Sequence, residues 1–194
     1  MGKYILSFTA ASALIYENIT IAKQQVIHKD WAKTRQVVLE ENLLMKDKQA
    51  TALRQYKEIE LRLKTLSDNQ VERIATGDMD EVKIMVWLSI LNTYEFFKEI
   101  SLECVYESYF FGGKTITNSD YYAFWESKKI QYPEIEKLSD ATAAKIKQVA
   151  FKIMEQVGII DSVKSRNITV PLMSVELENE IKGNSPEILK MFLR

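Results

Sequence analysis

Residues 48–67 read KQATALRQYKEIELRLKTLS, and this stretch decides the fold class. Apolar side chains recur in it every three or four residues, so one helical face would contain Ala52, Leu53, Tyr56, Ile59, Leu63 and Leu66. Such spacing is typical of an amphipathic α-helix that buries one face against a core. The stretch therefore predicts a packed helix.

The same periodicity extends along nearly the whole chain. It predicts helices at about 10–28, 31–45, 48–67, 69–76, 79–111, 119–131, 139–157, 172–182 and 185–193. Residues suited to begin a helix precede five of them: Thr9, Asp30, Asp78, Ser119 and Ser139. Three glycines follow helical segments and could end them: Gly77, Gly112 and Gly158. The long segment 79–111 is expected to break near Asn92-Thr93.

Length and composition limit the size of the core and the class of protein. The chain has 194 residues, 46% of them hydrophobic, which is enough for one good core or two small ones. A single cysteine, Cys104, excludes an internal disulfide, and no apolar run reaches the length of a membrane span. We therefore expect a cytoplasmic all-α protein, a compact helical bundle that needs no cofactor or metal.

Charge is distributed unevenly. Residues 1–71 contain 11 basic and 8 acidic side chains, and residues 137–170 contain 6 and 3, a net charge of +3 in each. Residues 72–136 contain 6 basic and 12 acidic side chains, a net charge of −6. Local fields attract or repel a polyanion, so the flanks are the candidate binding regions. We expect three regions: 1–68, a central acidic region 69–131, and 132–194.

The first candidate binding element is a helix-turn-helix at 31–67. Its second helix should turn its polar face outward, with residue types that contact phosphates and base edges. The candidate DNA-binding residues there are Lys46, Lys48, Thr51, Arg54, Gln55, Lys57 and Arg62.

The second candidate lies in 119–170, where two predicted helices are followed by two short β-branched segments around a polar loop. That pattern could form the wing of a winged helix. The candidate DNA-binding residues are Lys145, Gln148 and Lys152 on the helix and Lys164 and Arg166 in the loop. An amphipathic helix with lysines outside is common, so periodicity alone does not assign either element to DNA.

Several segments in order resemble the BrxA family of the bacterial BREX phage-exclusion systems. They include Asp30-Trp31, Glu40-Glu41-Asn42-Leu43-Leu44, Arg54 through Glu58 to Arg62-Leu63, and Gly158-Ile159-Ile160. The resemblance covers residues 4 to about 161. It implies a fold similar in outline to the antitermination factor NusB, binding of double-stranded DNA, and association with other BREX components such as a methyltransferase and an ATPase.

Groups suited to catalysis are few. His28 and Cys104 have no partner at metal-ligand spacing, and Gly112-Gly113-Lys114-Thr115 lacks the earlier glycine of a phosphate-binding loop. Four glutamates at four-residue spacing, Glu95, Glu99, Glu103 and Glu107, predict a solvated or partner-facing acidic stripe. We therefore expect that the protein is not an enzyme. NusB-like RNA binding and a protein-interaction role within the BREX complex stay open as alternatives.

Overall fold

The computed structural model describes residues 4–183 and 185–194 and confirms the all-α class. Within these residues β-structure is limited to two isolated antiparallel bridges, Thr115–Asn167 and Ile160–Ile168. Contacts divide the chain into two compact units. We call residues 10–93 the N-terminal unit, and residues 4–9 with 94–183 and 185–194 the C-terminal unit. The division at 93/94 does not coincide with the boundaries expected near residues 68 and 131.

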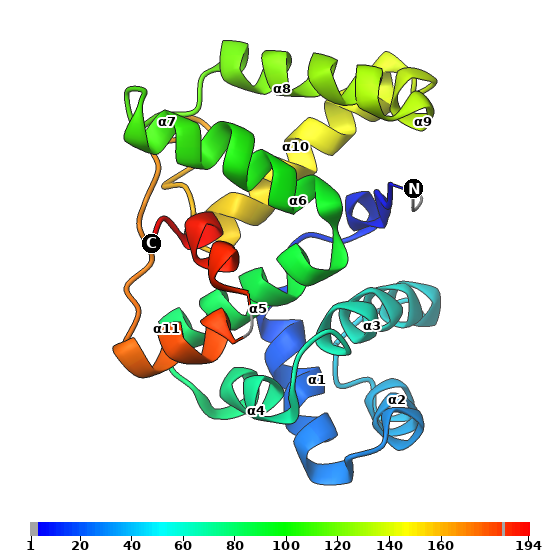
Figure 1. Cartoon of the computed structure of the whole chain (residues 1–194). Helices are drawn as coiled ribbons and strands as arrows, with labels where there is room; N and C mark the ends of the chain where they lie inside the picture. Colours follow the sequence, from blue (N-terminus) through cyan, green and yellow to red (C-terminus); the bar gives the residue numbers. More distant parts are fainter. Residues whose placement is uncertain (1–3, 184) are drawn as a thin grey trace. The chain divides into compact units, whose positions relative to one another are not determined.

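The N-terminal unit is built around α1. Its helices are α1 (Ile15–His28), α2 (Trp31–Glu40), α3 (Gln49–Leu63), α4 (Asp68–Thr76) and α5 (Met79–Thr93). α1 contacts each of the other four (Figure 1), and within α5 the nearly continuous apolar run from Ile84 to Leu91 is buried on all sides. A helix without a polar face belongs inside a core, which explains the burial of this run.

Side chains define where most of these helices begin. The Asp30 carboxylate accepts from the Ala32 N–H at 2.7 Å, and the Asp78 carboxylate accepts from the N–H groups of Asp80 and Glu81 at 2.9 Å, which confirms both predicted caps. The cap predicted at Thr9 is wrong. That residue lies in a short 3-10 turn, η1 (Ser7–Ala10), and α1 begins only at Ile15.

The late start of α1 has a local cause. Leu14 adopts a left-handed conformation with φ of 56°, and the buried Asn18 amide donates to the carbonyls of Ala13 and Leu14 at 2.9 Å each. A buried amide that bonds the preceding backbone fixes the chain in a non-helical entry to α1. Periodicity gives no sign of such a contact.

The C-terminal unit contains the remaining elements. They are α6 (Glu95–Ile100), η2 (Ser101–Tyr106), α7 (Glu107–Phe110), α8 (Asn118–Gln131), α9 (Pro133–Glu136), α10 (Asp140–Gln156), α11 (Val175–Lys182) and η3 (Pro186–Phe192). The predicted break near Asn92-Thr93 is confirmed, because buried Tyr94 is extended there. η2 is a π-helix, and a 3-10 helix replaces the α-helix expected at 185–193.

Aromatic rings form much of this unit's core. Phe8 lies 5.5 Å from Tyr94, 5.2 Å from Phe96 and 4.8 Å from Phe97, measured between ring centroids, and Phe96 lies 5.6 Å from Phe124. All five rings are buried. Residues 4–9 therefore belong to this unit because Phe8 enters its aromatic cluster.

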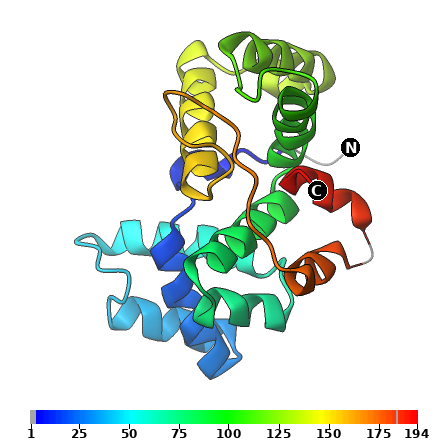
Figure 2. The same cartoon turned by 90° about the vertical axis from the view of Figure 1, so that its left-hand side faces the viewer.

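A side-chain cap begins each of the two helices α8 and α10. Thr117, not the predicted Ser119, begins α8, where its hydroxyl and the Asp120 carboxylate form a reciprocal capping box. Ser139 caps α10 as predicted. A long connection joins α10 to α11 (Figure 2), first as a loop with turns at residues 163–165 and then as irregular chain up to α11.

The finer motifs expected from the sequence are not confirmed. α2 ends at Glu40, and residues 41–48, with Asn42 and Met45 at positive φ, separate it from α3. A helix-turn-helix uses a turn of about three to four residues. At the predicted wing a single bridge, Ile160–Ile168, closes the loop without forming strands in the described residues.

Candidate nucleic-acid interface

One face of α10 presents three of the predicted contact residues to solvent. Lys145, Gln148 and Lys152 are exposed and follow one another at three- and four-residue spacing. Lys145 Nζ donates to Gln148 Oε1 at 3.3 Å, and Lys152 Nζ lies 2.5 Å from Glu155 Oε2. Both contacts lie within one turn of the exposed face of α10, where a hydrogen bond or an ion pair of this kind stabilises little and exchanges readily with solvent. The ammonium groups are therefore accessible to an external anion.

The loop 161–167 stands next to this face. Its backbone is arranged around Asp161, whose Oδ1 accepts from the N–H groups of Ser162 at 2.6 Å and Asn167 at 2.9 Å. The Val163 N–H donates to Glu155 Oε1 at 3.1 Å. Hydrogen bonds from Lys152 and from Val163 lower the pKa of the Glu155 carboxyl, which keeps it charged as the anchor between helix and loop. Lys164 is exposed in this loop.

Arg166 does not extend that face, contrary to the expectation. It joins Lys147, which lies about 200° around the helix axis from Lys145 and which sequence reasoning missed. Asn118 Oδ1, at the first turn of α8, accepts from Arg166 Nη1 at 2.8 Å and from Lys147 Nζ at 3.0 Å. The guanidinium lies 5.1 Å from the Phe151 ring centroid and the ammonium 5.0 Å from that of Tyr121.

We call Lys147 and Arg166 the cation pair. Partial burial, and then the charge of Arg166, lower the pKa of Lys147. Neither cation has a carboxylate partner among the residues the structure describes; they share one neutral amide oxygen. No sequence signal indicated this pair, because Asn118 lies 29 residues before Lys147 and 48 before Arg166.

In the first candidate element, the outward orientation predicted for Arg62 is wrong. Arg62 is 0% exposed. Its Nη1 donates to the Ser12 carbonyl at 2.9 Å, and its Nη2 donates to the Ala11 carbonyl at 3.2 Å and lies 3.3 Å from Glu58 Oε1. The segment that leads into α1 covers this side of α3, so Arg62 is a structural residue and cannot contact DNA.

The other residues of that element are only partly brought together. Lys48, Arg54 and Lys57 are exposed, whereas Thr51 and Gln55 are half-buried. Lys46 lies 2.8 Å from Glu17 Oε1, so its charge is compensated. The exposed stripe of α3 is thus narrower and more apolar than expected, since it also contains Leu61.

The predicted acidic stripe is only partly solvated. Lys128 is 1% exposed and lies 2.6 Å from Glu103 Oε1 and 3.4 Å from Glu99 Oε1. Glu99 also accepts from the Tyr4 hydroxyl at 2.5 Å and the Tyr132 hydroxyl at 2.7 Å. The bond to Glu99 raises the pKa of Tyr132 to about 12. Glu99 and Glu103 therefore organise the C-terminal unit.

The single cysteine is poorly suited to act as a nucleophile because it is buried. Burial raises the pKa of the Cys104 thiol to about 12, so the reactive thiolate is suppressed. No group of three or more His, Cys, Asp or Glu side chains suited to a metal ion occurs within residues 4–183 and 185–194. In the same residues no helix is long and apolar enough to cross a membrane.

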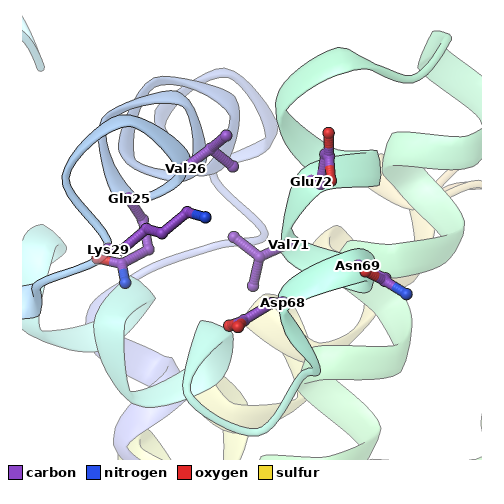
Figure 3. A pocket seen from close by; sticks show the side chains of 7 residues that line it. All are labelled: Gln25, Val26, Lys29, Asp68, Asn69, Val71 and Glu72. Atoms are coloured by element: carbon purple, nitrogen blue, oxygen red, sulfur yellow. The ribbon is translucent and has the colours of Figure 1, made fainter.

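A polar cavity of about 310 Å³ lies in the N-terminal unit, between the end of α1 and the start of α4. Figure 3 shows Gln25, Val26 and Lys29 on one side and Asp68, Asn69, Val71 and Glu72 on the other. One lysine faces two carboxylates here. The cavity is therefore unsuited to an anion such as phosphate.

The helical fold and the cation pair define the class of protein. It is an all-α protein whose C-terminal unit has two neighbouring positive charges without a carboxylate partner among the described residues. The BrxA family model matches residues 2–185, so the chain belongs to the BrxA family. A relative from Bacillus cereus (strain H3081.97), named BREX protein BrxA, is 32% identical over 123 residues, which are 63% of this chain and 62% of the relative. The match thus spans less than two thirds of that relative.

A solved structure supports the fold. The crystal structure of an uncharacterized protein from Magnetospirillum magneticum superposes with a TM-score of 0.84 and covers 98% of each chain at 17% sequence identity. At that identity the likeness concerns the fold alone. The NusB-like outline expected from the sequence stays a prediction.

Proposed function

We propose that this chain binds double-stranded DNA as a non-catalytic component of a BREX phage-defence system. The assignment to BREX rests on membership of the BrxA family and on the name of the Bacillus cereus relative. The observation that supports DNA binding most strongly is the cation pair, in which two like charges share only the Asn118 oxygen. Repulsion between them is relieved by an anion, and duplex DNA offers one phosphate charge about every 1.7 Å of its axis.

The α10 face and the 161–167 loop provide the rest of the proposed interface. Lys145, Lys152 and Lys164 are exposed and provide three further cations for phosphates, on a side of α10 that lies about 200° around the helix axis from Lys147. Gln148 is the one predicted contact on this face with an amide that could bond a base edge. Phosphate contacts do not read sequence, so we expect little base specificity. Lys48, Arg54 and Lys57 of the N-terminal unit could add contacts of the same kind.

A protein-interaction role is the second candidate, and one observation favours it. Phe110 and Phe111 are 50% and 78% exposed, and Phe111 lines a groove with Glu103 and Glu107. Exposed aromatic side chains next to carboxylates suit a basic, partly apolar partner surface. Other BREX components, such as the methyltransferase or the ATPase, are the proposed partners of this groove.

Competition binding separates the candidate functions. We expect a labelled duplex to be displaced by unlabelled duplex at lower concentration than by single-stranded DNA or RNA of the same sequence and length. Preferential displacement by RNA would transfer the assignment to RNA, and no binding to any of the three would favour the protein-interaction role. With Mg²⁺ or Mn²⁺ and ATP present, the same samples should show neither cleaved DNA nor ATP hydrolysis.

A further inference from the structure

A groove lies next to the cation pair, and apart from Lys147 its lining has no role in duplex binding through phosphates. It lies between α8 and α10, which cross in the C-terminal unit (Figure 1), and has a volume of about 430 Å³. α8 lines it with Asn118, Ser119, Tyr121, Tyr122 and Trp125, and α10 lines it with Ala143, Ala144 and Lys147. The groove is thus aromatic on one side and small and apolar on the other, with a cation at one end.

The two walls suit a flat ring. Tyr121 and Trp125 are buried and nearly parallel, with ring centroids 6.3 Å apart and planes at 11°, so they form a rigid wall. Tyr122 lines the groove and is 66% exposed, so its ring is accessible to a ligand. Ala143 and Ala144 have no side chain beyond Cβ, which leaves the facing side open. Aromatic faces stack with nucleobases largely independently of base identity.

The end of the groove suits a phosphate. Lys147 lines it, and Arg166 lies next to Lys147 on the shared Asn118 oxygen. Asn118 and Ser119 are the first residues of α8, and the N–H groups in a first turn have no acceptor within the helix. Asp120 is a nearby negative charge that would repel a phosphate, and its Oδ2 accepts from the backbone N–H and the hydroxyl of Thr117 at 2.7 Å each.

We propose that this groove holds one unpaired nucleotide of a DNA molecule bound on the same unit. Its base stacks on Tyr122 against the Tyr121–Trp125 wall, and its phosphate lies between Lys147 and Arg166. The proposal rests on the proposed function, because the nucleotide belongs to DNA whose duplex part contacts the neighbouring cations. It predicts that the protein prefers duplexes with an unpaired nucleotide at an end or a gap.

The test compares a blunt duplex with the same duplex extended by a single unpaired 2-aminopurine nucleotide. We expect the extended duplex to bind about tenfold more tightly and its 2-aminopurine fluorescence to be quenched on binding. Tyr122→Ala should remove both effects while the blunt duplex binds as before. Tyr16→Ala is the matched control, because Tyr16 is 74% exposed on α1 in the other unit. Ala144→Leu fills the groove without removing a ring and should reproduce the effect of Tyr122→Ala.

The outcomes are distinguishable. Equal binding of the two duplexes without quenching would overturn the proposal and leave the proposed function intact. Quenching that survives both Tyr122→Ala and Ala144→Leu in proteins of native helicity would overturn it too. Failure to bind the blunt duplex would contradict the proposed function instead. If free deoxyadenosine monophosphate displaces the extended duplex as effectively as an unlabelled copy does, the occupant is a free nucleotide and the proposal for DNA is wrong.

Discussion

Replacing Arg62 with alanine is expected to lower the free energy of unfolding by about 3–5 kcal/mol. The guanidinium is fully buried and donates to the carbonyls of Ala11 and Ser12, and it lies next to the Glu58 carboxylate. The substitution removes the donor to both carbonyls and the cation beside a largely buried carboxylate. Denaturant unfolding followed by helical circular dichroism measures the loss.

Arg54→Ala is the matched control for this prediction. It makes the same chemical change on the same helix, but Arg54 is exposed. Its free energy of unfolding should stay within about 0.5 kcal/mol of the parent. If Arg62→Ala were as stable as Arg54→Ala, the structural role assigned to Arg62 would be wrong and its place in a DNA interface would be open again.

Replacing Lys128 with alanine is expected to lower the free energy of unfolding by about 3 kcal/mol. The ammonium is buried between Glu99 and Glu103 and bonds Gln131 Oε1 at 2.9 Å. Its loss leaves two neighbouring carboxylates without the cation between them. Because the Glu103 side chain is 43% exposed and can be hydrated, we place the effect below that for Arg62.

Lys129→Ala is the control on the next residue of α8. Lys129 forms a surface pair with Glu126 at 2.7 Å, and both side chains are more than a third exposed. Solvent and salt screen such exposed pairs, so they contribute little to stability and Lys129→Ala should melt close to the parent. Equal melting temperatures of the two variants would contradict the role of Lys128 in holding Glu99 and Glu103 together.

Most of the helical fold could be predicted because it depends on local patterns. The period of 3.6 residues located α2, α3, α8 and α10, and capping residues such as Asp30 and Ser139 defined two of their starts. The break before Tyr94 was also predictable from the polar Asn92-Thr93 inside an otherwise apolar run. The start of α1 was not, since it depends on the buried side chain of Asn18.

The candidate site was harder to predict because it depends on contacts between distant segments. A helical wheel shows which residues border the apolar face, but not whether another segment covers that border, so Arg62 was placed outside. Lys128 and the glutamates of α6 and η2 meet across about 25 residues of sequence. The π-helix at Ser101–Tyr106 also has a wider turn than an α-helix. Glutamates four residues apart therefore do not lie on one helical face there, as the α-helical spacing had predicted.

Salt dependence of duplex binding tests the central claim most directly. With about five phosphate contacts, the slope of log K against log salt concentration should be about −4 to −5. In the Lys147→Gln/Arg166→Gln variant the slope should be smaller in magnitude by about two. The control variant Lys182→Gln/Lys190→Gln, which removes two exposed lysines elsewhere in the same unit, should keep the parent slope. A parent slope near zero, or a slope unchanged when the cation pair is neutralised, would contradict the account.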